Sequence, residues 1–204
     1  MLLFMKYLSN SLKNITFEIK DDLKEVEFNT WQSIKAQQIT QGNSKDKLDY
    51  REYWFNEKMA NEQGYKLLDR QLTKITSISE VGKDYNVEVA DLYKNGELIA
   101  VKISDKPHDL IYNIQQSITT IQTIQRGAIE FKSSITDVVL WISTTKKVKN
   151  LIDINSIQFL LAIQTWKEII EGFNLKPKIY YSHHEKPKPP QKNQKAKKKT
   201  GGKA

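Results

Sequence analysis

The chain has 204 residues, of which 39% are hydrophobic and 27% are charged, and this length and composition suit one globular domain with a full core. It contains no cysteine, which excludes disulfides, thiolate nucleophiles and cysteine-based metal sites. Its formal net charge is +8, no apolar run is long enough to span a membrane, and the opening MLLFM is too short for a secretory signal, so we expect a cytoplasmic protein without a membrane partner.

Residues 1–48 are expected to form an N-terminal lead-in that precedes the main domain. Within it, the segments ITFEI and EVEF alternate polar and apolar residues as strands do. The segment MKYLSNSLKNI has the composition of a short helix. We expect the main domain to cover residues 49–182.

The main domain starts with a predicted helix, YREYWFNEKMANEQ, which consists of good helix formers and ends at Gly64. YKLLDRQLTKI then has the length and composition of a strand. The next segment, VEVADLYKNGELIAVKISD (residues 87–105), indicates two strands joined by a two-residue turn at Asn95-Gly96. Asn-Gly suits such a turn because both central residues need a positive φ.

The remaining elements alternate between helix and strand. LIYNIQQSITTIQTIQRG repeats isoleucine every three or four residues, which predicts a helix that ends at Gly127. DVVLWIS is a short apolar strand, SIQFLLAIQTWKEIIEGF is an amphipathic helix with a serine cap, and PKIYYS is a last strand. The order α-β-β-β-α-β-α-β predicts an α/β (α+β) domain in which helices flank both faces of a mixed β-sheet.

Residues 183–204 are expected to form a disordered basic tail, because they are rich in proline, lysine and glutamine and have no apolar periodicity. From residue 185 onward there are eight lysines and one glutamate, which account for +7 of the total charge of +8. Such a tail can bind nucleic acid through its phosphates without sequence preference, or it can simply keep the protein soluble. The candidate contacts with nucleic acid are Lys195, Lys197, Lys198 and Lys199.

Asp91 and Lys102 are the unusual residues of the predicted hairpin, since neither contributes to a core. A two-residue turn pairs Tyr93 with Leu98 and Asp91 with Ala100. Asp91 and Lys102 are then diagonal neighbours on one face, about 7–8 Å apart at the backbone, and their side chains converge. In phosphodiester hydrolysis an aspartate can hold a divalent metal, and a lysine can position water and stabilise negative charge. The alternative is a cross-strand ion pair of little energetic consequence.

A metal at this point would be held mainly by carboxylates and water, because the chain has only three histidines. This favours Mg²⁺, Mn²⁺ or Ca²⁺ over zinc. Glu88 is the nearest second carboxylate, but strict alternation turns it away from Asp91 unless a β-bulge intervenes. A loop one residue longer would instead bring Glu88 beside Lys102 and turn Asp91 away. Glu57, on the preceding helix, is the other candidate.

The order of elements and these residues together resemble the PD-(D/E)XK superfamily of restriction-endonuclease-like nucleases. In that pattern a helix carries a glutamate, a strand an aspartate, the next strand (D/E)-x-K, and the following helix often a glutamine. Those places are occupied here, in that order, by Glu57, Asp91, Lys102 and Gln116. Ala100 stands where the second metal-binding carboxylate is expected. The resemblance implies a restriction-endonuclease-like core with Mg²⁺ or Mn²⁺ as its cofactor.

A more specific resemblance is to the C-terminal domain of a sporadically distributed bacterial family of unknown function, which is associated with mobile elements and defence regions. It covers residues 52–182 and includes EYWFNEKMA, LLDR, VEVADLY and LIAVK. Members tend to have Glu and Asp at the places of Glu88 and Asp91, and a non-acidic residue two positions before their lysine. This pattern implies that the missing carboxylate has moved to Glu88. Members also tend to have His in place of Tyr112 and Gly in place of Ser117.

We therefore expect a metal-dependent, nuclease-like domain that hydrolyses phosphodiester bonds in nucleic acid, with DNA rather than RNA as the expected substrate although the sequence does not distinguish the two, in bacterial defence or competition between mobile elements. The resemblance assigns metal binding to Asp91 and Glu88, with Glu57 as a further ligand. It assigns activation of water or stabilisation of charge to Lys102, and orientation of a phosphate or a neighbouring side chain to Gln116.

Two alternatives remain open. The first is a degenerate relative that has kept the fold but lost catalysis, and that binds nucleic acid or a protein partner. The second is an immunity or scaffold protein that neutralises a partner, and an inhibitor or immunity protein is equally conceivable as a partner of the nuclease. The only sequence feature that favours the immunity or scaffold function is the aromatic content around Trp54, Trp141 and Trp166, which core packing explains as well.

Overall fold

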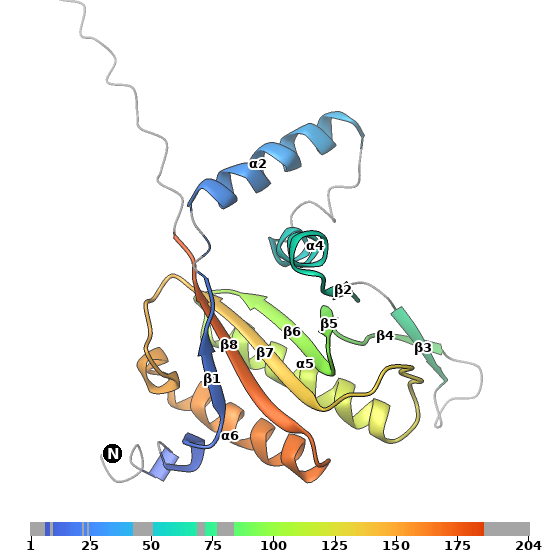
Figure 1. Ribbon diagram of the computed structural model, residues 1–204, viewed down its shortest axis with the longest axis vertical. Helices are drawn as coiled ribbons and strands as arrows, with labels where there is room; N and C mark the ends of the chain where they lie inside the picture. Colours follow the sequence, from blue (N-terminus) through green and yellow to red (C-terminus); the bar gives the residue numbers. More distant parts are fainter. Residues whose placement is uncertain are drawn as a thin grey trace, which may run out of the picture.

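The computed structural model describes residues 7–8, 10–21, 23, 25–42, 51–68, 72–76 and 84–185. Most strands belong to one sheet (Figure 1). They are β1 (Thr16–Ile19), β2 (Lys66–Leu67), β5 (Leu92–Lys94), β6 (Glu97–Ile103), β7 (Asp137–Thr144) and β8 (Lys176–His183). The helices are α2 (Glu25–Thr40), α4 (Arg51–Gln63), α5 (Pro107–Gln125) and α6 (Ile157–Gly172), with the short 3-10 helix η1 (Leu151–Ile154) before α6.

The sheet has six strands in the order β1-β8-β7-β6-β5-β2. The pairs β1–β8, β8–β7 and β7–β6 are parallel, whereas β6–β5 and β5–β2 are antiparallel. Helices α5 and α6 pack on one face and α4 packs on the other (Figure 1). The predicted α/β class, with a mixed sheet flanked by helices, is confirmed.

The two faces of the sheet bury separate apolar clusters. The larger cluster joins the sheet to α5 and α6 and contains Ile114, Leu140 and Trp166. The smaller cluster lies under α4, where Phe55 meets Trp141 edge-to-face with ring centroids 4.9 Å apart. Every residue of β7 is buried, as expected for a central parallel strand that is covered on both faces.

The helices end where the sequence predicts. Pro107 occupies the first turn of α5, where its missing amide costs no hydrogen bond. After α5 the chain turns at Gly127, whose φ of 71° is one that other residues rarely adopt. Ser156 caps α6 by accepting a hydrogen bond from the Phe159 amide at 3.4 Å. These local signals place α5 and α6 against the sheet.

The strands before the Asn95-Gly96 turn differ from the prediction. YKLLDRQLTKI contains two strands, β2 and β3 (Leu72–Thr76), and the first arm of the hairpin is divided into β4 (Asp84–Glu88) and β5. β3 and β4 pair with each other in a separate two-stranded sheet. The observed order therefore contains more strands than the predicted one. Pairing partners decided this division, and composition does not specify them.

The N-terminal segment contributes to the same sheet. ITFEI contains β1, as predicted, and β1 pairs with β8, the last described strand, so this part of the expected lead-in belongs to the same sheet as the main domain (Figure 1). Leu8, Leu12 and Ile15 join the larger cluster. The strand prediction for EVEF was wrong, because α2 starts at Glu25. A four-residue alternation is too short to distinguish strand from helix.

Residues 183–185, the described part of the expected tail, are ordered against the rest of the chain. His183 ends β8, and buried His184 forms an isolated bridge with Leu23. Residues 186–204, which include the four candidate lysines, lie outside the described residues. Within the described part of the chain, no helix combines the length and apolarity needed to cross a bilayer.

Candidate functional site

The turn at Asn95-Gly96 sets the register that the sequence predicts. Lys94 lies opposite Glu97, and Tyr93 lies opposite Leu98. Asn95 has a φ of 50° and Gly96 a φ of 90°, so both central residues adopt the positive φ that this turn requires. A Cβ atom at Gly96 would lie 2.6 Å from Oγ1 of Thr136, which is a second reason for glycine there.

The ladder between β5 and β6 ends at Leu92, which lies opposite Ile99. The Asp91 amide donates to the carbonyl of the same Ile99 at 3.1 Å, so two residues face one, as in a β-bulge. The predicted pairing of Asp91 with Ala100 is therefore not part of the ladder. β6 continues past this point to Ile103, and its edge is completed by side chains.

Two carboxylates bind the amides of β6 beyond the end of the ladder. The Val101 amide donates to Oδ2 of Asp91 at 2.7 Å, and the Ile103 amide donates to Oε1 of Glu52 at 3.2 Å. A buried amide left without a partner costs about 1–3 kcal/mol, so these contacts stabilise the strand edge. Asp91 and Glu52 take the place that a neighbouring strand would occupy.

Asp91, Lys102 and Gln116 line one cavity of about 310 Å³ between β6 and α5. Asp91 and Lys102 thus line the same cavity, although Asp91 lies at the bulge rather than within a strand and the ion-pair partner of Lys102 is Glu52. Ala100, which stands at the place of the expected carboxylate, lines the same cavity.

The acidic partner of Lys102 is Glu52, which the sequence analysis did not single out. Nζ of Lys102 lies 3.1 Å from Oε1 of Glu52, and the Glu52 side chain is only 7% exposed. Glu57, the predicted helix acid, is half-buried and does not line the cavity. The buried residues of α4 are Glu52, Phe55, Asn56 and Met59, which have the spacing of one helix face. This spacing was the signal that distinguishes Glu52 from Glu57.

Asn56 is one turn after Glu52 on the same buried face of α4. Its Nδ2 lies 3.3 Å from Oδ1 of Asp91, so the two oxygens of Asp91 receive hydrogen bonds from Asn56 and from the Val101 amide. These contacts fix the orientation of the Asp91 carboxylate beside the cavity. Each carboxylate oxygen has more than one acceptor site, so Asp91 keeps capacity for a further partner.

The cavity offers one carboxylate, that of Asp91, to a divalent ion. Mg²⁺ is held in proteins by one or two carboxylates together with the phosphates of a substrate, and Asp91 supplies one such carboxylate at the cavity. Glu88 ends β4 opposite Leu72, and its side chain lies outside what the structure describes, so its role stays a prediction. Among the described residues there is no group of three or more acidic or histidine side chains that could hold a metal by themselves.

Helix α5 presents polar side chains to the cavity between its buried isoleucines. Gln116 is exposed, whereas Asn113, Ser117 and Thr120 are buried, and all four line the cavity. Oγ of Ser117 accepts a hydrogen bond from Nε1 of Trp166 at 3.2 Å. The isoleucines predicted the helix, and Gln116 was predicted as a site residue, but Asn113, Ser117 and Thr120 were not. Polar residues at helical spacing on a face that packs against a sheet were the available signal.

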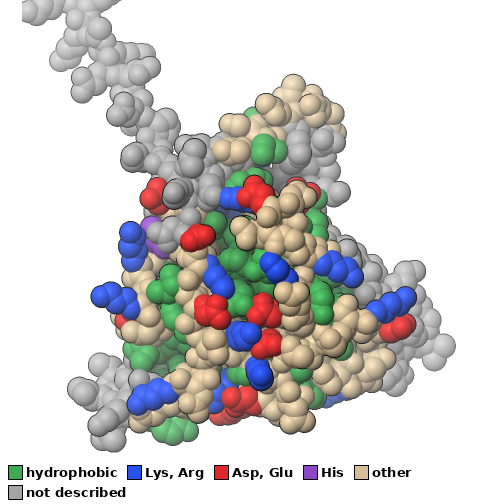
Figure 2. Space-filling view, viewed as in Figure 1, with side chains coloured by type: hydrophobic (Ala, Val, Ile, Leu, Met, Phe, Trp, Pro, Cys, Tyr) green, Lys and Arg blue, Asp and Glu red, His purple; other side chains and the backbone are tan. Residues whose placement is uncertain are grey.

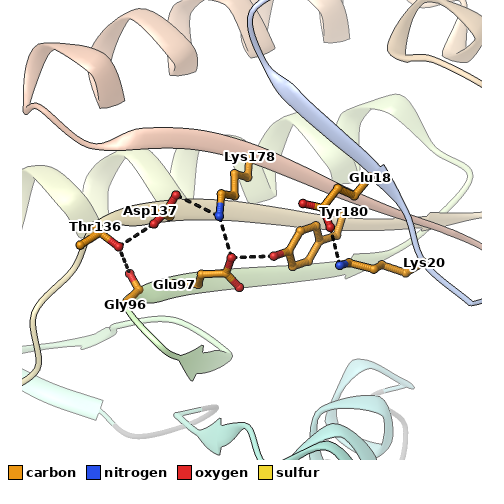
Figure 3. Close-up of polar contacts among 8 residues, drawn as sticks. All are labelled: Glu18, Lys20, Gly96, Glu97, Thr136, Asp137, Lys178 and Tyr180. Carbon is orange, nitrogen blue, oxygen red and sulfur yellow. Dashed lines mark hydrogen bonds and ion pairs between the residues drawn. The ribbon is translucent and has the colours of Figure 1, made fainter.

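A second group of charged residues lies on the opposite face of the sheet, beside α4. Figure 2 shows acidic and basic side chains gathered at the centre of that face, with hydrophobic side chains around them. Figure 3 shows their contacts. Oε1 of Glu97 accepts from Nζ of Lys178 at 2.9 Å and from the Tyr180 hydroxyl at 2.7 Å. Nζ of Lys178 also lies 3.0 Å from Oδ1 of Asp137.

These contacts shift the protonation of the cluster. Burial alone would raise the pKa of Asp137, but hydrogen bonds from Thr136 and Lys178 lower the pKa overall. Burial alone would lower the pKa of Lys178, but hydrogen bonds to Glu97 and Asp137 raise the pKa overall. Burial and the neighbouring Glu97 raise the pKa of Tyr180 far above its usual range. The cluster joins β6, β7 and β8 through internally paired charges, so we assign it a role in stability.

Comparison of the chain with protein-family models, with curated proteins and with solved structures finds no match.

Proposed function

We propose that this protein hydrolyses phosphodiester bonds in nucleic acid, with DNA as the expected substrate, at the cavity between β6 and α5. The observation that supports the proposal is that Asp91 and Lys102, from the two arms of one hairpin, and Gln116, from helix α5, line one cavity. The PD-(D/E)XK pattern requires this convergence, and an arbitrary set of surface residues would not produce it. The cytoplasm is the compartment that suits such a substrate.

Each of the three residues has a role in this proposal that its environment supports. Asp91, oriented by Asn56 and by the Val101 amide, would hold Mg²⁺ or Mn²⁺. When bound, the ion supplies positive charge to the phosphate and makes water more acidic. Lys102 would stabilise the negative charge that develops on the phosphate, because its ammonium group is held in place by Glu52. Gln116, exposed at the cavity, would donate a hydrogen bond to a phosphate oxygen.

The cellular setting and the lysine-rich segment are further parts of the proposal. The resemblance to a bacterial family associated with mobile elements suggests defence or competition between such elements. Lys195, Lys197, Lys198 and Lys199 would add affinity for any nucleic acid and make that affinity fall steeply with salt. Neither part is needed for hydrolysis at the cavity.

Incubation of the purified protein with plasmid DNA and with bulk RNA tests the proposal. The reactions contain Mg²⁺, Mn²⁺ or a chelator, and compare the parent with Asp91→Asn and Lys102→Gln. Lys106→Gln is the matched control, because Lys106 is an exposed lysine outside the cavity. We expect metal-dependent cleavage by the parent and the control, and a loss of about a hundredfold or more in the two cavity variants. Equal cleavage by all four proteins would contradict the proposal.

A second candidate function is nucleic-acid or protein binding without catalysis. It is favoured by Ala100, which lines the cavity where an acidic residue is expected, and by the structural use of Asp91 at the strand edge. Such a protein would bind duplex DNA with a steep salt dependence and would cleave nothing with any divalent ion. The same incubation, combined with a binding measurement at several salt concentrations, separates the two functions.

A further inference from the structure

Asn113 is a buried polar residue on the wall of the cavity. It is 5% exposed, lies on α5 and lines the cavity together with residues of β6. Its side-chain amide has no hydrogen bond to any residue that the structure describes. Its amide atoms are not among the fully enclosed polar atoms without a partner, so solvent in the cavity reaches them, and polar groups in such places are usually bonded to water or to a ligand. An amide that faces a cavity is therefore available to a molecule that enters the cavity.

Tyr112, the residue before Asn113, is 62% exposed and lines the same cavity. An aromatic ring exposed to this extent gains little from packing, so its position is not explained by the core. Tyr112 is also one helical turn before Gln116, which lines the cavity as well. The cavity therefore combines an exposed aromatic ring, a buried amide and the residues proposed to bind a phosphate.

We propose that Tyr112 and Asn113 form a subsite for one unpaired nucleobase, next to the phosphate held by Asp91 and Lys102. This inference rests on the proposed function, since it requires that nucleic acid binds at the cavity. The Tyr112 ring stacks on the base, because every base has a flat face that aromatic side chains accept. The Asn113 amide offers both a donor and an acceptor to the polar edge of that base.

The size of the cavity supports an unpaired base rather than a duplex. A volume of about 310 Å³ is at the lower end of the range of small-ligand pockets, which is about 300–1,000 Å³. It accommodates one nucleotide, whereas a base inside a duplex is already stacked on both faces and paired along one edge. A base can contact both Tyr112 and Asn113 only after it has left the stack, as in single-stranded nucleic acid.

The other polar residues on this part of α5 have different roles. The hydroxyl oxygen of Ser117 accepts a hydrogen bond from Nε1 of Trp166. Gln116 is exposed and is proposed above to bind a phosphate oxygen. Asn113 is therefore the buried amide of the cavity that remains for a base.

Binding of labelled oligonucleotides to the full chain, in the presence of chelator so that no cleavage occurs, tests the inference. The probes are a single strand, the duplex of the same sequence, and a single strand of the same length whose bases are replaced by abasic sites. The single strand and the abasic strand carry equal numbers of phosphates. Any contribution from the basic tail is therefore the same for both.

We expect the parent to bind the single strand more tightly than the abasic strand, and Tyr112→Ala to weaken binding of the single strand more than binding of the duplex. Tyr112→Ala and Asn113→Leu should each weaken binding of the single strand by about tenfold and leave binding of the abasic strand unchanged. Tyr112→Phe should bind like the parent, because it keeps the aromatic face. Ile157→Ala, at an exposed apolar position on α6 outside the cavity, is the control.

Equal affinity of the parent for the single strand and the abasic strand would overturn the inference. This comparison is made with the parent, so it does not depend on whether a variant folds. Tyr112→Ala changes an exposed side chain and is expected to fold even if Asn113→Leu does not. Metal-dependent cleavage is measured separately, so a subsite that fails here is distinguished from a cavity that does not hydrolyse phosphodiesters.

Discussion

The main-chain amide of Val101 donates a hydrogen bond of 2.7 Å to Oδ2 of Asp91, ten positions earlier in the chain. Asp91 thereby replaces part of a strand at the edge of β6, and Glu52 does the same for Ile103. The residue proposed to hold a metal is thus also part of the structure. Variants that separate its charge from its hydrogen bonding are needed to distinguish the two roles.

Asp91→Asn should keep most of the stability of the parent, because an amide oxygen can still accept from Val101. Asp91→Ala should lower the free energy of unfolding by about 1–3 kcal/mol, since the buried Val101 amide then loses its partner. Unfolding in urea measures both, with Asp21→Ala, at an exposed position, as the control. If Asp91→Ala proved as stable as the parent, the hydrogen bond to Val101 would have no structural importance.

Glu52 and Glu57 should respond differently to truncation. Glu52→Ala removes the acceptor of the Ile103 amide and leaves the half-buried Lys102 without its acid, so we expect a loss of about 2 kcal/mol or more. Glu57→Ala should change the free energy of unfolding by no more than about 0.5 kcal/mol. Thermal or urea unfolding of the two variants in parallel is the measurement. Equal losses would show that the buried face of α4 has been wrongly assigned.

The elements defined by local signals were predictable from the sequence. Asn95-Gly96 specified its own turn, the isoleucines of α5 specified a helix, and Ser156 specified the start of α6, because each of these depends on neighbouring residues alone. The turn also sets the register of β5 on β6, but only as far as Leu92, so the position of Asp91 at the bulge did not follow from the turn.

What the sequence could not show depends on contacts between distant segments. β1 joins the sheet through β8, more than a hundred residues later, and nothing in the four residues of β1 specifies that partner. The division of the first hairpin arm at the bulge, and the selection of Glu52 over Glu57, both follow from how α4 packs against the edge of β6. Helical periodicity favoured Glu52, but only the packing shows which face of α4 meets the sheet.

Ala100→Asp tests metal binding at the cavity directly. Ala100 lines the cavity together with Asp91, so a carboxylate there should complete an oxygen donor set for Mg²⁺. A ligand that binds only the folded state raises its stability. We expect Mg²⁺ to raise the Tm of Ala100→Asp more than that of the parent or of Thr119→Asp, a control at an exposed position of α5 outside the cavity. Identical responses to Mg²⁺ in all three proteins would count against a metal at this cavity.

The Glu97–Lys178–Asp137 cluster should make stability depend on pH at both ends of the scale. The pKa of Asp137 is below its ordinary value of 3.8, so its contribution is present above that value and is lost as the pH falls through the lower, folded-state pKa. The pKa of Lys178 is above its ordinary value of 10.5, so its contribution is present below that value and is lost as the pH rises through the higher, folded-state pKa.

The contribution of Asp137 is measured by urea unfolding of the parent and of Asp137→Asn from neutral pH to below pH 3.8. The parent should be the more stable protein at neutral pH, and the difference should shrink as the pH falls below 3.8, because the carboxyl group of the parent then becomes neutral as well. If the difference in free energy of unfolding stayed constant down to the lowest pH, the charge of Asp137 would not contribute to the stability of the cluster.

We propose above that phosphodiester bonds are hydrolysed at the cavity between β6 and α5 and that Lys102 stabilises the phosphate. The most direct test is the single-turnover rate of Mg²⁺-dependent cleavage by Lys102→Gln, compared with Lys106→Gln. We predict that Lys102→Gln loses about a hundredfold or more of the parent rate, while Lys106→Gln retains it. Cleavage by Lys102→Gln at the parent rate, or no cleavage by the parent with any divalent ion, would contradict the claim.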